Sequence, residues 1–173
     1  VNASDILQDS DRTLECGSGT AVYEESSNTL TLNAAIIDTV YQNESTGIYA
    51  NGDLNIVVNG ECSITEDGLD NFQTTIGIGI WANGTLNISG GGSLTINVKD
   101  AGVQANSIFL TDTKISVVCQ YNAFWANGGT ITISGGDIAA TSNGGNPALW
   151  ADMDMIITGG KINAVSSGSN GMG

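Results

Sequence analysis

Apolar residues along this chain recur in a short phrase in which an apolar residue stands two positions before an alanine. Five copies follow one another: Ile48/Ala50, Ile80/Ala82, Val103/Ala105, Phe124/Ala126 and Leu149/Ala151. The apolar residues of successive copies are 32, 23, 21 and 25 positions apart. Alternation with a period of two, without a period of 3.6, predicts short strands that each bury one face.

Two further alternating pairs follow each phrase, and a turn that is often rich in glycine separates them. The second pairs are Leu54/Ile56, Leu86/Ile88, Ile108/Leu110, Ile131/Ile133 and Met155/Ile157. The third pairs are Cys62/Ile64, Leu94/Ile96, Ile115/Val117, Ile138/Ala140 and Ile162/Ala164. Three short strands in each repeat of roughly 20–25 residues are typical of one rung of a parallel β-solenoid. An antiparallel sandwich would need hairpins and would not place like residues at like positions in every rung.

The repeats predict an all-β, single-stranded parallel β-helix of about six rungs. The earliest of these rungs can be fitted at Leu30/Leu32 and Ile37. We expect residues 28–166 to form the β-helix domain and residues 167–173 to form a C-terminal tail. Residues 1–27 are polar, and we expect them to be an irregular cap, because an open solenoid end invites edge-to-edge polymerisation.

A polar residue directly follows the alanine of every phrase. The column consists of Asn51, Asn83, Asn106, Asn127 and Asp152. Corners between sheets use left-handed backbone, which asparagine and glycine tolerate best, and stacked amides can hydrogen-bond from rung to rung. We therefore interpret this column as scaffold, with left-handed corners.

The charge balance excludes some partners. The chain has 18 acidic residues, four lysines and arginines and no histidine, which gives a net charge of −14. Binding to nucleic acid requires a basic face, so no nucleic-acid partner is expected. No apolar run reaches the length of a membrane span, so no membrane insertion is expected. The charge suits a soluble protein in an extracellular setting.

The three cysteines, Cys16, Cys62 and Cys119, cannot all pair within one chain. No CxxC motif is present, and no histidine is available to complete a zinc site. We expect three buried, reduced thiols that pack as small apolar side chains.

The long interval between the first two copies contains about ten extra residues, so we expect residues 65–78 to leave the solenoid as a loop. Its acidic residues Glu66, Asp67 and Asp70 form the densest carboxylate cluster of the chain. This cluster is a candidate calcium site, although a solvated loop explains the same residues and the spacing is not that of an EF-hand. Calcium is the one cofactor that the sequence suggests.

Catalysis is not expected. Polysaccharide-cleaving enzymes on solenoids need a base beside a bound metal ion or a set of carboxylates. Few carboxylates recur at equivalent rung positions, and Lys114, in mid-solenoid, has no second cation in an adjacent rung. No set of nucleophile, base and orienting residue is visible, so the sequence predicts a protein that is not an enzyme.

The residue between the two buried positions of each phrase points outward. These residues are Tyr49, Trp81, Gln104, Trp125 and Trp150, and they include all three tryptophans of the chain. They should form an aromatic column on one outer face, with one side chain per rung. Each ring offers roughly 150–250 Å² of surface, which together exceeds what a monomer usually leaves exposed.

Three interpretations of the aromatic column remain open. The favoured one is a platform on which a polysaccharide stacks along the solenoid axis. The second is a protein contact, either an adhesive surface for a host or partner surface protein or a homodimer through the aromatic face. In the third, the loop at 65–78 or the N-terminal segment covers the rings.

Several segments resemble one family in their repeat pattern. "GSGTAVYEESSNTLTLNAAIID" (17–38), "GIYANGDLNIVVNGECSIT" (47–65) and "GIWANGTLNISGGGSLTINV" (79–98) are similar to bacterial cell-surface β-helix proteins described as carbohydrate-binding domain-containing. The resemblance implies a right-handed β-helix without catalysis that is secreted or associated with the cell wall. One branch of the family binds polygalacturonate with calcium, but its acidic calcium positions have no clear counterpart in this sequence.

Overall fold

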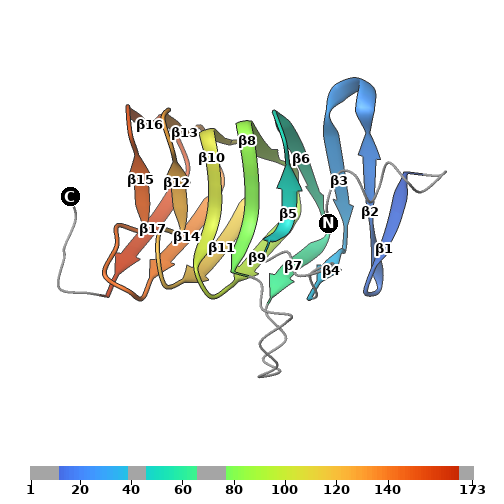
Figure 1. Cartoon of the computed structure of the whole chain (residues 1–173), viewed down its shortest axis with the longest axis horizontal. Coiled ribbons are helices and arrows are strands. Elements are labelled where there is room, and N and C mark those ends of the chain that lie inside the picture. The colour runs from blue at the N-terminus through green and yellow to red at the C-terminus, as the bar shows by residue number, and fades with distance from the viewer. Residues whose placement is uncertain (1–11, 39–45, 66–76, 168–173) are drawn as a thin grey trace.

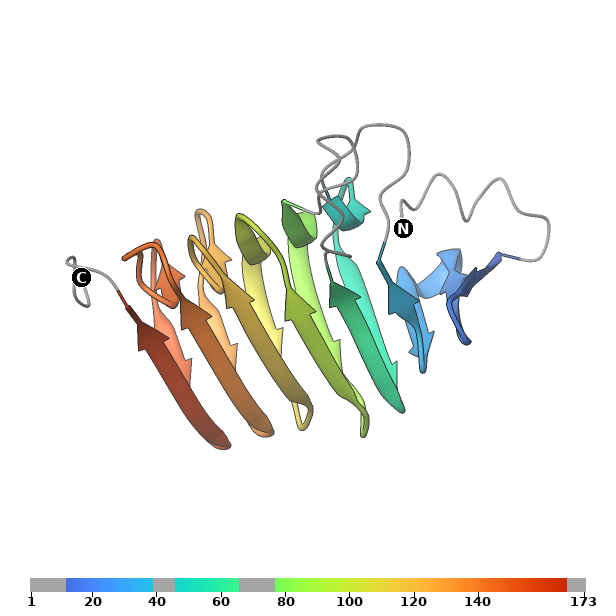
Figure 2. The same cartoon turned by 90° about the horizontal axis from the view of Figure 1, so that it is seen from below.

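The computed structural model describes residues 12–38, 46–65 and 77–167, and within these ranges the chain is built from strands and one short 3-10 turn (η1, Glu25–Ser27). Successive rungs stack side by side along the long axis of the molecule (Figures 1 and 2). The fold is a β-solenoid of about five turns with parallel sheets, which confirms the predicted fold class.

The turns correspond to the five copies of the repeat. Their strands are β5 (Thr46–Ala50), β6 (Leu54–Asn59), β7 (Glu61–Thr65), β8 (Ile78–Ser89), β9 (Ser93–Asn97), β10 (Ala101–Leu110), β11 (Lys114–Cys119), β12 (Phe124–Ala126), β13 (Ile131–Ile133), β14 (Asp137–Ser142), β15 (Leu149–Ala151), β16 (Met155–Ile157) and β17 (Lys161–Ser166). The earlier rung that the sequence suggested contains β3 (Thr29–Asn33) and β4 (Ile36–Ile37).

Two sheets run the length of the solenoid. The first and second strands of every rung belong to one sheet, whose central path is β3-β6-β8-β10-β12-β15, and the third strands form the other, in the order β17-β14-β11-β9-β7-β4. All of these neighbours pair in parallel, and like residues face like residues. Stacked β-strands of this kind lie about 4.7–4.9 Å apart.

The asparagine column does not form the corners that we expected. In β8 and β10 the strand continues through it, and both halves stay in one sheet. The pairing register shifts here, so that Asn83 and Gly84 together lie opposite Asn106. A β-bulge of this kind bends a strand without a left-handed residue. Positive φ angles at non-glycine residues occur at Arg12, Asn28, Ala34 and Asp112 and not in the column, so the prediction of left-handed asparagines is wrong.

The N-terminal end carries an antiparallel extension instead of an irregular segment. Strands β1 (Thr13–Cys16) and β2 (Gly19–Glu24) pair with each other, and β2 pairs with β3, all antiparallel. An ion pair of 2.7 Å joins Arg12 to Glu25 beside them. These strands occupy the edge of the first sheet (Figure 1). Residues 1–11 of the expected cap lie outside the described residues.

The inner positions of the repeat fill the core as predicted. Ile80, Val103 and Phe124 are fully buried, and the alanines that follow them are buried too. Cys16, Cys62 and Cys119 are free thiols in this core, as expected. Burial removes apolar surface from water and is the main favourable contribution to folding.

The last rung is an exception to this pattern. Met155 and Ile157 occupy inner positions, yet they are 42% and 51% exposed. Within the described part of the chain no strand pairs with the outer edges of β15, β16 and β17. The solenoid therefore ends on an apolar rung that no further described strand covers.

Glycine at the start of the phrase has a steric cause. A Cβ atom at Gly79 would lie 2.6 Å from the backbone oxygen of Gly102 in the next rung and 2.5 Å from Ile96 Cγ2. Side chains cannot approach so closely, so this rung requires glycine at position 79. In the last two rungs alanine occupies the equivalent position, at Ala123 and Ala148.

Candidate functional site

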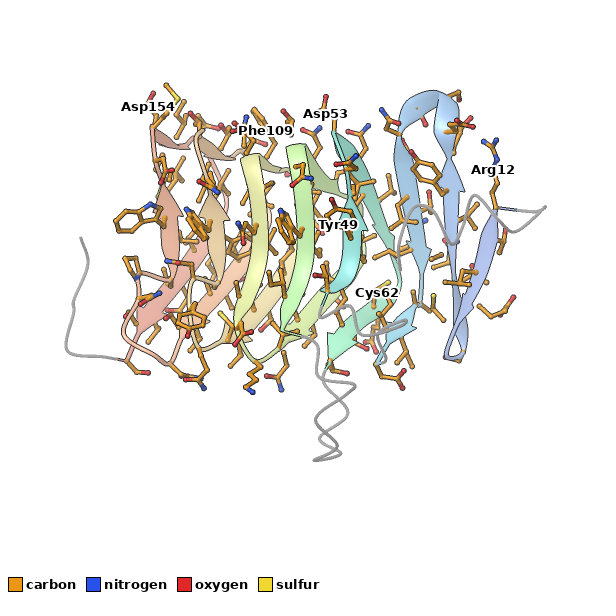
Figure 3. The ribbon with its side chains drawn as sticks, in the orientation of Figure 1. Arg12, Tyr49, Asp53, Cys62, Phe109 and Asp154 are labelled. Atoms are coloured by element: carbon orange, nitrogen blue, oxygen red, sulfur yellow. The ribbon has the colours of Figure 1, made fainter. Side chains whose placement is uncertain are left out.

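The outward residues of the repeat phrase lie in register on the first sheet. Tyr49 pairs with Trp81, Trp81 with Gln104, Gln104 with Trp125, and Trp125 with Trp150. They stand on β5, β8, β10, β12 and β15, on the face that Figure 3 presents around Tyr49. The structure thus brings all five predicted site residues together at one rung position. We call this set the aromatic column.

In the N-terminal half of the column, the Tyr49–Trp81 pair, the rings contact each other and the tyrosine hydroxyl is hydrogen-bonded. The two rings meet edge to face, with centroids 5.6 Å apart and planes at 78°. Asn83 Nδ2 donates to Tyr49 Oη at 3.0 Å and to Asn51 Oδ1 at 3.0 Å. Tyr49 Oη donates in turn to Asn51 Oδ1 at 3.5 Å. The predicted amide ladder is therefore present between the first two rungs, and it also fixes the tyrosine.

The C-terminal half, the Trp125–Trp150 pair, lines an open hollow instead. Its volume is about 360 Å³. The lining residues are Asn122, Trp125, Asn146, Pro147, Trp150 and Asp152. Asn122 and Asn146–Pro147 come from the turns that precede β12 and β15, whereas Asp152 follows β15. Turns from two adjacent rungs therefore form one wall of the hollow, and the column forms its floor.

Hydrogen bonds hold the carboxylate and the outer ring in place. Trp150 Nε1 donates to Asp152 Oδ1 at 2.6 Å, and the Gly128 amide donates to Asp152 Oδ2 at 2.9 Å. Asn122 Nδ2 donates to the Pro147 carbonyl at 2.7 Å, which ties the two turns together. Because the Gly128 amide holds Asp152 and Asp152 accepts from the indole N–H, these two bonds restrain the Trp150 ring, which is 41% exposed.

Trp125 differs from its neighbour in the state of its N–H group. Its Nε1 atom is shielded from solvent and has no hydrogen-bond partner among the described residues. Leaving a buried donor unpaired costs about 1–3 kcal/mol. This cost favours any rearrangement that offers the indole an acceptor.

The hollow has a negative rim and lacks a cation. Asp152 is the charged residue among those that line it, and no lysine or arginine does. Two described cations are paired elsewhere, Arg12 with Glu25 and Lys161 with Asp137. An anionic ligand would meet repulsion from Asp152 without any compensating ion pair in the hollow.

Metal-ligating side chains do not cluster in the described part of the chain, and its cysteines lie in the core. No group of three or more His, Cys, Asp or Glu residues that could hold a metal ion occurs among the described residues. Glu66, Asp67 and Asp70 lie outside them, so the candidate calcium site is untested. Desolvation in the core raises the pKa of the Cys119 thiol to about 11 and also raises the pKa of Cys16, so these cysteines stay protonated and unreactive.

Sequence reasoning missed the wall of the hollow. Asn122, Asn146 and Pro147 stand in turns without periodicity, and Asp152 was interpreted only as scaffold. A signal was present in the segments "NAFW" and "NPALW", where an asparagine stands three or four positions before a tryptophan. Pro147 is also the single proline of the chain.

Comparison with known proteins identifies the family. A family model described as "Carbohydrate-binding domain-containing protein" matches residues 15–172. No curated protein and no solved structure matches the chain. Within the described residues, no helix has the length and apolar character needed to span a lipid bilayer. The chain belongs to the family of carbohydrate-binding domain-containing proteins.

Proposed function

From this family membership, we propose that the protein is a non-catalytic module that binds carbohydrate through its aromatic column, with the hollow beside Trp125 and Trp150 at the centre of the site. The observation that carries the proposal is this open hollow of about 360 Å³, lined by two tryptophans in register. Small-molecule sites have volumes of about 300–1,000 Å³. The hollow therefore fits a small unit of a glycan, such as a single sugar ring.

The lining residues provide the chemistry that a sugar needs. The faces of the indole rings carry negative quadrupole charge and attract the C–H groups on one face of a pyranose. Asn146, at the rim, offers an amide that can both donate to and accept from hydroxyl groups. A turn of the Trp125 ring would let its unpaired N–H donate to a sugar oxygen.

The arrangement favours binding over hydrolysis. Glycoside hydrolysis generally uses two carboxyl groups on either side of the scissile bond. Asp152 is the one carboxylate that lines the hollow, and both of its oxygens already accept hydrogen bonds. We place the module outside the cell as part of the same proposal, in keeping with its net charge of −14.

Affinity electrophoresis in gels that contain soluble polysaccharides tests the proposal. We expect Trp125→Ala and Trp150→Ala to migrate without the retardation of the parent protein. Phe109→Ala is the matched control, because Phe109 is an outward aromatic residue, 37% exposed, on β10 but away from the column (Figure 3). Circular dichroism checks that all variants are folded. Retardation that survives both tryptophan changes contradicts a sugar site in the hollow.

A protein contact at the same face is the second candidate function. The exposure of Trp150 on this face favours it, since its side chain is 41% exposed. A homodimer through the aromatic face would give twice the monomer mass by light scattering, and Trp150→Ala would return it to a monomer. A monomeric parent protein that is retarded by polysaccharide favours the first candidate.

A further inference from the structure

The charge around the hollow carries information about the kind of sugar that it accepts. Polysaccharides include neutral polymers and polymers of uronic acids, and each uronic acid unit carries a carboxylate at C6. The hollow offers two indole rings, two asparagine amides and one carboxylate. It offers no lysine or arginine that could pair with an anionic unit.

We propose that the hollow selects neutral sugar units and rejects uronic acids, and that Asp152 is the residue that determines this specificity. The inference rests on the proposed function, because it names the substrate class of the same site. Asp152 follows Trp150 by two positions, and its carboxylate lies within 2.6 Å of the indole nitrogen of that ring. A sugar stacked on Trp150 is therefore held next to this negative charge.

Two hydrogen bonds restrain Asp152 at the position where it faces a ligand stacked on Trp150. Its two oxygens are held by Trp150 Nε1 and by the Gly128 amide of the preceding rung. Two unit charges about 4 Å apart repel by about 1 kcal/mol even at the dielectric constant of water, and by more near a protein surface. One such contact lowers affinity about fivefold to tenfold or more. The carboxylate is also an acceptor for the hydroxyl groups of a neutral sugar.

Bridging by a metal ion would remove this discrimination, but the described residues do not provide a site for it. A uronate can bind an acidic surface when a cation links the two carboxylates. No group of three or more metal-ligating side chains is found in the described ranges, and Asp152 stands as a single carboxylate in the hollow. The selectivity should therefore be the same in the presence and absence of a chelator.

Matched pairs of polymers test the proposal. One pair is polygalacturonate and its carboxyl-reduced form, and the other is a soluble cellulose derivative and its C6-oxidised form. The members of each pair differ in whether C6 is a carboxylate or a hydroxymethyl group. Affinity electrophoresis with EDTA measures the dissociation constant for each polymer. We expect the parent protein to bind a neutral member at least tenfold more tightly than its acidic partner. High salt should reduce the difference, because ions screen exposed charges.

The variant Asp152→Asn examines the residue itself. It should bind the acidic polymer about fivefold to tenfold more tightly than the parent protein does, with a smaller change for the neutral one. Asp154→Asn is the matched control, because it removes one charge from the same rung at an exposed position that does not line the hollow (Figure 3). It should leave the selectivity unchanged.

Each outcome separates the two proposals. If the parent protein binds the acidic and neutral polymers equally and Trp150→Ala loses both, this result overturns the selectivity but supports the sugar site. Selectivity that persists in Asp152→Asn overturns the role of this residue. Retardation by none of the polymers overturns the proposed function itself.

Discussion

The two halves of the aromatic column share one rung position and one repeat phrase, but they have different surroundings. The Tyr49–Trp81 pair is closed, because the rings contact each other and the tyrosine hydroxyl is bound by Asn83 and Asn51. The Trp125–Trp150 pair is open, because a hollow lies beside its rings and one indole N–H has no partner. An aromatic side chain at the same place in the scaffold is therefore structural in one rung and available to a ligand in another.

The two halves differ in the groups that surround their rings. The β5 and β8 rungs supply amides that satisfy the tyrosine. Before β12 and β15, in contrast, Asn122 and Pro147 are tied to each other and build a wall beside the tryptophans. The predictions below test whether the open half binds and the closed half stabilises.

An alanine scan of the column should show the largest effect at the open half. Trp125→Ala and Trp150→Ala should each weaken binding to a neutral polysaccharide about 10–100-fold, since a lost stacking partner costs on the order of 2 kcal/mol. Tyr49→Ala should change affinity less than threefold. Isothermal titration with a soluble oligosaccharide measures these values. Equal losses at both ends would remove the distinction between the halves.

A substitution in the closed half should lower the stability of the fold and leave binding almost unchanged. Tyr49→Ala removes an edge-to-face ring contact and the hydroxyl that two asparagines share. We expect the free energy of unfolding to fall by about 1–3 kcal/mol, measured by urea denaturation. Trp150→Ala, at a partly exposed position of the last rung, serves as the comparison and should cost less. A larger loss of stability in Trp150→Ala than in Tyr49→Ala contradicts this assignment.

Gln104 lies between the two halves of the column, and a tryptophan in its place should make the row of aromatic rings continuous. Gln104 is half-buried and in register with Trp81 and Trp125. Gln104→Trp should raise affinity for long oligosaccharides about threefold to tenfold and leave affinity for a disaccharide unchanged, because only a long ligand reaches the added ring. An equal gain for both ligands would show that the new ring acts within the hollow itself.

Alkaline pH should lower the free energy of unfolding of the whole solenoid, because both halves of the column stand on one hydrophobic core. The pKa of Cys119 is raised from 9.0 to about 11 by burial. Between these values the unfolded chain releases the thiol proton and the folded chain keeps it, so the stability falls as the pH rises from about 9 towards 11. Urea denaturation at pH 8 and pH 10 should show this loss, and Cys119→Ala should reduce the slope with pH.

Calcium removal should have the smallest effect. If Glu66, Asp67 and Asp70 bind calcium, EDTA should lower the melting temperature, because a ligand bound only to the native state stabilises it. Binding at the Trp125–Trp150 pair should not change. An unchanged melting temperature in EDTA would argue against the calcium site and leave the comparison of the two halves intact.

The period of two in the sequence was sufficient to predict the fold and the alignment of the column. Burial alternates so regularly that the sequence pattern alone predicts Trp125 and Trp150 to be outward and in register, as the structure has them. The asparagine column was misinterpreted because an Asn-Gly pair suits a left-handed corner and a bulge equally well, and only the pairing of β8 with β10 distinguishes them.

The hollow could not be predicted for a different reason. Turns such as those at Asn122 and Pro147 have no periodicity, and their positions depend on how two rungs pack. The role of Asp152 depends on a hydrogen bond to a ring two positions earlier, which a residue pattern does not reveal. Sequence reasoning therefore found the floor of the site but missed its wall.

The stacking of like residues on like residues makes the length of this surface adjustable. Phe124 lies on Leu149 and Ile131 on Met155, so each rung presents its neighbour with nearly the same template. Duplication of one turn of roughly 20–25 residues would insert one more column position and move the flanking halves apart by about 4.8 Å. Evolution or a protein engineer can thus change the reach of such a surface in whole steps, by copying a turn and leaving the rest of the fold as it is.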